Sequence, residues 1–248
     1  MHYKLITIII LLTASINVFA IKTDFNTGSF QITSTVSELV DTKTLKTLSN
    51  ILQADDLIEW QVHVPKNYNP QRKPGLMVYI SPTPTGKIPA KWLSLMEKHN
   101  LIWVGANSSG NNVDSRKRLM MAILATSIID KNYIIDLKRV YVAGFSGGGR
   151  MASIASTTYP QLFNGAIYIC GVNYWGDISH EGLEQIKKNR FVFITGRQDF
   201  NLQDTKKVFR KYKKAGMENI KLLINPIMGH SNPSKKDFES AIIYLDNI

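Results

Sequence analysis

The sequence predicts an α/β fold in which a mostly parallel sheet is covered by helices on both faces. Short, continuously apolar runs recur along the chain, and each is separated from the next by a segment compatible with a helix. Runs that are apolar at every position suit parallel strands buried on both faces. The runs are LMVYI (76–80), LIWVGA (101–106), RVYVAG (139–144), GAIYIC (165–170), FVFIT (191–195) and KLLIN (221–225).

Two earlier segments have a different pattern. In DLIEWQVHVP (56–65), apolar residues alternate with Glu59, Gln61 and His63, as in a strand with one face in water. The segment SFQITSTV (29–36) is similar. We therefore expect antiparallel N-terminal edge strands ahead of the parallel core.

The first twenty residues, MHYKLITIIILLTASINVFA, have the pattern of a secretory signal peptide. Lys4 precedes an apolar run, and Val18 and Ala20 occupy positions −3 and −1 of a cleavage site. The run is far shorter than the ~20 residues of a membrane span, so an anchor is the less favoured alternative. We expect a cleaved signal peptide (1–20), one domain (21–248), and export to the periplasm or the exterior.

Charge and cysteine content restrict the partners. The formal net charge is +11, and much of the excess lies in TKKVFRKYKKAG (205–216). A solvated helix face explains this segment most simply, and weak attraction to an anionic surface is the alternative. No nucleic-acid motif accompanies it, so we expect no nucleic-acid partner. Cys170 is the single cysteine and lies in an apolar run, so we expect neither an internal disulfide nor a metal site.

The stretch VYVAGFSGGGRMAS (141–154) contains the motif G-x-S-x-G at Gly144 to Gly148. In this motif a sharp turn from strand to helix lifts a serine hydroxyl, here that of Ser146, clear of the sheet. Two other glycine motifs fit less well. A phosphate-binding P-loop would need Lys-Ser/Thr after the last glycine, and a dinucleotide fingerprint would need an acidic residue at the tip of the next strand. A glycine-rich turn without chemistry is a third alternative.

A nucleophilic serine needs a base, and the base needs a carboxylate to orient it. Asp199 follows the run 191–195, and His230 follows the run 221–225, so the chain order is Ser146, Asp199, His230. Asp177 is a rival for the acid because it follows the preceding strand. Parallel strands bring their carboxyl ends to one edge of the sheet, which predicts that the three side chains meet there.

On these residues, positions 28 to 248 resemble the α/β-hydrolase fold. RVYVAGFSGGGRMAS, followed by YPQLFNGAIYICG, is similar to the secreted polyhydroxybutyrate-depolymerase and feruloyl-esterase type of serine esterase. The resemblance implies hydrolysis of carboxylic esters through an acyl-enzyme, without a metal or an organic cofactor. A serine peptidase, an acyltransferase and a non-catalytic binding protein remain as alternatives.

The oxyanion hole should combine the amide of Gly147 with an amide from the loop after the run 76–80. Relatives of this type commonly carry His-Gly in that loop, whereas this chain has Ser81-Pro82. Thr83 is the aligned donor, with Thr85 and Gly86 as alternatives, because prolines have no N–H to give.

The segment from Val172 to Arg190 has room for one loop and one short helix, which is too little for a multi-helix lid. We therefore expect an open site without a large lid. Its apolar walls are expected to suit short, aromatic or polymer-end acyl groups. The candidate wall residues are Phe145, Tyr174, Trp175 and Phe200, with Trp92 as a further candidate.

Overall fold

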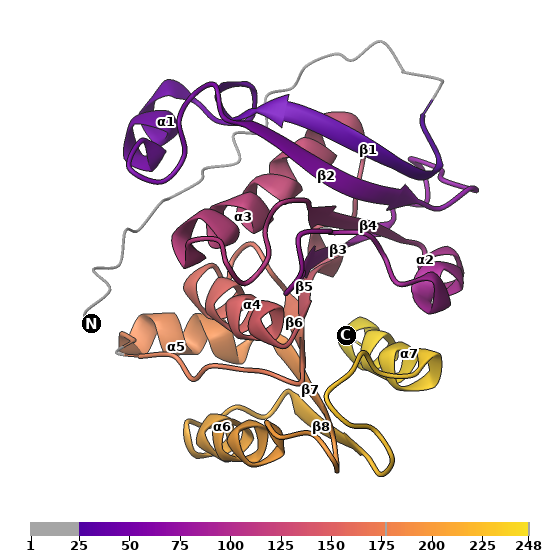
Figure 1. The fold of residues 1–248 in the computed structure, drawn as a ribbon, viewed down its shortest axis with the longest axis vertical. Coiled ribbons are helices and arrows are strands. Elements are labelled where there is room, and N and C mark those ends of the chain that lie inside the picture. Colours follow the sequence, from indigo (N-terminus) through magenta and orange to yellow (C-terminus); the bar gives the residue numbers. More distant parts are fainter. Residues whose placement is uncertain (1–24, 177, 248) are drawn as a thin grey trace.

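One eight-stranded sheet organises the chain in the computed structural model, which describes residues 25–176 and 178–247 (Figure 1). The expected signal peptide and Asp177 lie outside the described residues. The strands are β1 (Gly28–Thr35), β2 (Leu57–Val64), β3 (Gly75–Ile80), β4 (Leu101–Ala106), β5 (Val140–Phe145), β6 (Gly165–Ile169), β7 (Arg190–Gly196) and β8 (Ile220–Asn225). The α-helices are α1 (Thr42–Leu48), α2 (Leu93–His99), α3 (Ser115–Asn132), α4 (Gly147–Thr158), α5 (His180–Lys187), α6 (Leu202–Lys214) and α7 (Lys235–Asp246).

The strand order is β1-β2-β4-β3-β5-β6-β7-β8. The pairs β1–β2 and β2–β4 are antiparallel, and the pairs from β4 to β8 are parallel. The predicted fold class is therefore confirmed, including the antiparallel start. Two details differ from expectation. Strand β2 lies between β1 and β4 rather than at the edge. His63 is buried because α2 packs against β2, and its ring nitrogens are hydrogen-bonded to Ser29 and to Glu97 of α2.

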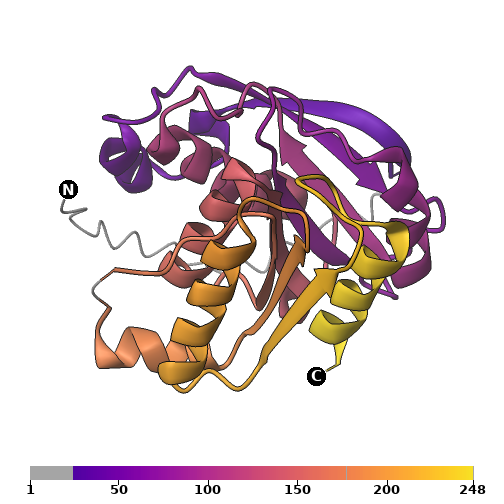
Figure 2. The ribbon, with the colours of Figure 1, turned by 60° about the horizontal axis from the view of Figure 1, so that its bottom comes forward.

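Helices cover both faces of the sheet, as the continuous apolar strands require. Helices α2 and α7 lie on one face, whereas α3, α4 and α6 lie on the other (Figures 1 and 2). Strand β3 contributes side chains to the apolar clusters on both faces of the sheet. Leu76 and Val78 belong to one cluster, and Met77 and Tyr79 belong to the other. None of the helices in the described part of the chain is long and apolar enough to cross a membrane.

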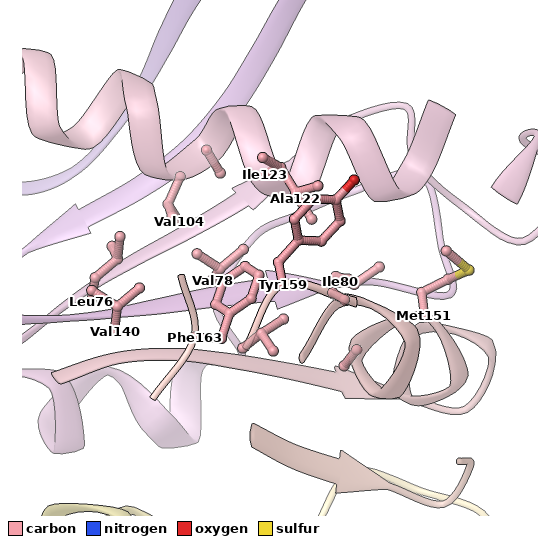
Figure 3. Packing of buried hydrophobic residues seen from close by; sticks show 14 of the residues in the cluster. Leu76, Val78, Ile80, Val104, Ala122, Ile123, Val140, Met151, Tyr159 and Phe163 are labelled. Carbon is pink, nitrogen blue, oxygen red and sulfur yellow. The ribbon is translucent and has the colours of Figure 1, made fainter. Parts of the chain in front are cut away.

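The larger cluster fills the space between the sheet and α3 and α4. Figure 3 shows Ile123 of α3 above the side chains of the central strands and Met151 of α4 beside Ile80, with Tyr159 and Phe163 between the helices and the strands. This packing fixes α4, and thereby the turn that precedes it, against the sheet.

The register places the ends of neighbouring parallel strands level with one another. Phe145 pairs with Ile169 between β5 and β6, Ile169 with Ile194 between β6 and β7, and Gly196 with Asn225 between β7 and β8. The loops that follow β5, β6, β7 and β8 therefore leave the sheet at one edge, where the candidate site residues were expected.

We expect Phe238→Ala to destabilise the fold by about 3–5 kcal/mol, because it removes a fully buried ring and leaves a cavity. Phe238 of α7 stacks on Trp92 at a centroid distance of 3.9 Å and joins α7 to the α2 region. Phe200→Ala is the matched control, since Phe200 is 76% exposed and should change stability by no more than about 0.5 kcal/mol. Urea denaturation measures both variants, and equal losses would contradict this account of the core.

Candidate active site

The turn between β5 and α4 holds Ser146 in a strained conformation. Its φ of 54° and ψ of −119° lie where L-residues are rare. The Ser146 amide donates to the carbonyl of Ile169 at 2.7 Å, which ties the turn to β6. Positions 144 and 148 have no room for a side chain. A Cβ on Gly144 would overlap the Gly148 carbonyl, and a Cβ on Gly148 would overlap the Ile80 carbonyl. The two glycines therefore let strand, turn and helix approach closely enough for this geometry.

Ser146, His230 and Asp199 form one hydrogen-bonded relay. His230 Nε2 lies 2.9 Å from Ser146 Oγ, and His230 Nδ1 lies 2.8 Å from Asp199 Oδ1. The side chain of Asp199 is fully buried, and that of His230 is 21% exposed. A carboxylate can only accept, so Nδ1 carries the proton and Nε2 is left to accept the serine proton. The three residues that the sequence places on successive strand ends are brought together in this way.

The surroundings of Asp199 favour its ionised form. Thr195 Oγ1 donates to Asp199 Oδ2 at 2.7 Å, and the Asn201 amide donates to Oδ1 at 3.0 Å. Burial alone would raise the pKa of the Asp199 carboxyl, but hydrogen bonds from Asn201, His230 and Thr195 outweigh it and hold this pKa below its usual value. A negative charge is therefore kept beside His230, where it can stabilise an imidazolium.

The two candidate oxyanion donors have different surroundings. Gly147 is the first residue of α4, so its amide belongs to the helix N-terminus directly after Ser146. The Thr83 amide, in contrast, donates to Ser81 Oγ at 3.1 Å, and the two hydroxyls of these residues lie 2.9 Å apart. The Thr83 amide would have to give up its hydrogen bond to Ser81 before it could donate to the substrate oxyanion.

The candidate wall residues separate into two groups. Phe145 and Phe200 flank the base, with ring centroids 5.0 and 4.1 Å from that of His230. Tyr174 and Trp175 stack on each other, and both rings contact Tyr212 of α6 instead.

Trp92 is fully buried against Phe238, so its proposed place in the wall was wrong. The sequence could not show this, because the same aromatic residue in the segment after a strand can be exposed beside a site or buried in the core.

A buried arginine that was not predicted from the sequence joins two loops at this edge. Arg118 of α3 is 5% exposed; its Nε donates to the Ser109 carbonyl at 2.7 Å and its Nη2 to the Ser81 carbonyl at 2.9 Å. A signal was present, since Arg118 shares a helix face with Met121 and Ala122, both buried. A charge on the apolar face of a helix indicates a specific polar partner.

One group of possible metal ligands lies in the described part of the chain. Cys170 Sγ, a carboxylate oxygen of Asp199 and a ring nitrogen of His230 lie within 4.8 Å of one another. Burial is the main cause that raises the pKa of the Cys170 thiol, and Asp199 adds to it. Because a metal binds the thiolate and Asp199 is already hydrogen-bonded to His230, this group is poorly prepared to bind a cation.

Residues 121–179, which include the Ser146 turn, match the prolyl oligopeptidase family. No curated protein matches the sequence significantly.

Among solved structures, a ferulic acid esterase aligns with a TM-score of 0.62 at 14% identity over 89% of this chain and 99% of that one. An S-formylglutathione hydrolase from Staphylococcus aureus aligns with a TM-score of 0.60 at 13% identity, over 89% of this chain and 100% of that chain. A putative dipeptidyl aminopeptidase IV from Bacteroides ovatus aligns with a TM-score of 0.62 at 16% identity. This alignment covers 88% of the present chain but only 35% of the Bacteroides ovatus chain.

The chain therefore has the α/β-hydrolase fold, and the expected resemblance to α/β-hydrolase esterases is confirmed at the level of that fold.

Asp199→Asn should change how stability depends on pH. Because folding lowers the pKa of Asp199, its ionised form stabilises the fold above about pH 4, and this contribution is lost as the pH falls through the lower, folded-state value. The difference in free energy of unfolding between wild type and Asp199→Asn should thus be largest at neutral pH and shrink toward about pH 3. Urea denaturation at both pH values measures it, and an undiminished difference in acid would contradict the prediction.

Proposed function

We propose that the protein is an exported serine hydrolase that cleaves carboxylic esters through Ser146, His230 and Asp199. The continuous relay from Ser146 Oγ through His230 to the buried Asp199 carries the proposal. Each distance is within hydrogen-bonding range, and the serine stands on a turn whose strain is characteristic of a nucleophile elbow.

In the proposed reaction, Ser146 Oγ attacks the ester carbonyl while His230 Nε2 takes the hydroxyl proton. Asp199 holds the imidazole through Nδ1–H and stabilises the positive charge that forms on it. His230 then returns the proton to the departing alcohol, which leaves an acyl group on Ser146. Water activated by the same imidazole releases the acid and restores the serine. The Gly147 amide, with Thr83 as the aligned second donor, would stabilise the negative oxygen of each tetrahedral intermediate.

Aromatic side chains beside His230 support the proposal that the acyl group is short, aromatic or at a polymer end. Phe145 and Phe200 provide apolar surface on either side of His230, and Phe200 is largely exposed. The segment between β6 and α5 contains no helix in its described residues, which is in keeping with an open site. Tyr174 and Trp175 remain candidates for more distant substrate contacts, because both are only partly buried in the loop that follows β6.

A peptidase is the second candidate, because the match of residues 121–179 is to the prolyl oligopeptidase family. The same relay can acylate from an amide or from an ester, so geometry alone does not separate them. Hydrolysis rates for p-nitrophenyl esters, a feruloyl ester and the matching anilides make the distinction. Faster cleavage of anilides than of esters would favour the peptidase.

Export and weak attraction to anionic surfaces are proposed on sequence grounds. Helix α6 supports the second proposal, since Lys207, Arg210, Lys211, Lys213 and Lys214 are exposed on it. This charge can concentrate the protein near an acidic polymer without taking part in the reaction, and the effect should weaken with salt.

Ser146→Ala should lower kcat by about 10⁶, because it removes the nucleophile. In parallel, a fluorophosphonate should label Ser146 covalently in the wild type and fail to label the variant. Mass spectrometry of the labelled peptide identifies the site. Substantial ester turnover by folded Ser146→Ala would exclude the mechanism, and an unlabelled, inactive wild type would indicate a binding protein with a hydrolase fold.

Asp199→Asn should lower kcat by about 10⁴, because an amide in place of the carboxylate favours the wrong imidazole tautomer. Asp177→Asn is the matched control, since Asp177 was the rival acid in the sequence. Steady-state kinetics on one p-nitrophenyl ester compares the two variants. A larger loss in Asp177→Asn than in Asp199→Asn would assign the acid to Asp177.

A further inference from the structure

The side chain of Asn111, in the loop between β4 and α3, lies against the first residue of α4. A Cβ built on Gly147 would overlap Asn111 Oδ1 and would lie 2.7 Å from Asn111 Cγ and 2.8 Å from Nδ2. The carboxamide is therefore in contact with the Gly147 Cα, one residue beyond the nucleophile. Asn111 is otherwise exposed, and the structure gives its carboxamide no hydrogen-bond partner among residues 25–176 and 178–247.

Several backbone hydrogen bonds fix this loop before any substrate binds. The Asn111 amide donates to the Pro82 carbonyl at 2.9 Å, and the Ser108 amide donates to the Pro84 carbonyl at 2.6 Å. Arg118 joins the same two loops by donating to the carbonyls of Ser81 and Ser109. The loop after β4 is thus fastened to the loop after β3, and the Asn111 backbone is fixed with its side chain beside the N-terminus of α4. Donors that are positioned in advance are the ones that stabilise a transition state effectively.

The segment from Pro82 to Pro84 in the loop after β3 has no free backbone donor. Pro82 and Pro84 have no N–H, and the Thr83 amide between them already donates to Ser81 Oγ. A carboxamide, by contrast, has two N–H donors, and the Asn111 carboxamide is adjacent to Gly147, whose amide is the proposed first donor.

We propose that Asn111 Nδ2 donates a hydrogen bond to the oxyanion, together with the amide of Gly147. The proposal rests on the serine hydrolase function proposed above and adds a catalytic residue to it. As the bond between Ser146 Oγ and the acyl carbon forms, the carbonyl π pair moves to oxygen and the hydroxyl proton moves to His230. The Asn111 N–H stabilises that negative oxygen until the pair returns to form the carbonyl and the alcohol leaves with the proton.

The test compares Asn111→Ala with Asn112→Ala on a short p-nitrophenyl ester. Asn111→Ala should lower kcat by about 10² to 10³ with little change in KM, which is the cost of removing a side-chain oxyanion donor. Asn112 is the matched control because it is the neighbouring exposed asparagine, and its Oδ1 lies near Gly110 rather than near Gly147. Asn112→Ala should keep nearly all activity.

Two further measurements separate a donor from a structural residue. Asn111→Asp keeps the shape of the side chain but places a carboxylate beside the oxyanion, so its kcat should be at least as low as that of Asn111→Ala. Phenylboronic acid, which forms a tetrahedral adduct with the serine, should bind Asn111→Ala more weakly by a factor that follows the loss in kcat. Thermal melts of all variants show that they are folded.

The proposal is overturned if folded Asn111→Ala keeps wild-type kcat and boronate affinity, or if Asn112→Ala loses as much activity. It is also overturned if Asn111→Asp is as active as wild type, or if only Thr83→Pro, which deletes the Thr83 amide, lowers kcat. Losses in both Thr83→Pro and Asn111→Ala, with Asn112→Ala intact, support Asn111 as one of the donors. Fluorophosphonate labelling of Ser146 is the independent check: a labelled, active wild type with no effect of Asn111→Ala contradicts this proposal alone, whereas an unlabelled, inactive wild type contradicts the proposed function as well.

Discussion

The strained backbone at Ser146 is the constraint on which the rest of the site depends. A serine with φ of 54° directly after a strand and directly before a helix is stable only where its neighbours leave no other arrangement. Gly144 and Gly148 allow backbone to contact backbone, and the Ser146 amide is held by the carbonyl of Ile169. The buried face of α4, with Met151 and Ala152, then holds the helix against the sheet. Core packing in this way maintains the strain and directs Ser146 Oγ toward His230.

Parallel topology supplies the remaining partners of this serine. Strands β5, β7 and β8 run in the same direction, so the residues that follow them arrive at one edge although they are far apart in sequence. Level strand ends also let neighbouring loops share hydrogen bonds. The Arg197 amide donates to the Asn225 carbonyl, and the Gln198 amide donates to the Met228 carbonyl. The loops that carry Asp199 and His230 are therefore joined to each other as well as to the sheet, which accounts for the short distances in the relay.

Much of this arrangement could be predicted from the sequence, because it follows from local rules. Strands 101–106 and 165–170 were placed to within one residue from apolar continuity, and the glycines around Ser146 marked the turn. Side-chain directions in loops and at strand ends could not be predicted in the same way. His63 was expected in water but bonds to Glu97, and Tyr174 and Trp175 pack on Tyr212 because α6 passes beside them. Such outcomes depend on neighbours that only the tertiary fold provides.

The prolines after β3 explain why the carbonyls of this loop accept hydrogen bonds from residues outside it. Pro82 and Pro84 remove two donors but keep their carbonyls, so the segment from Ser81 to Pro84 offers more acceptors than donors. The structure meets three of these acceptors from outside: Arg118 donates to Ser81, the Asn111 amide to Pro82 and the Ser108 amide to Pro84. A buried guanidinium costs desolvation free energy, which two carbonyl partners offset, and in exchange two irregular loops are held in one geometry. The deficit of donors in one loop thus brings the neighbouring loop, and Asn111 with it, to the N-terminus of α4.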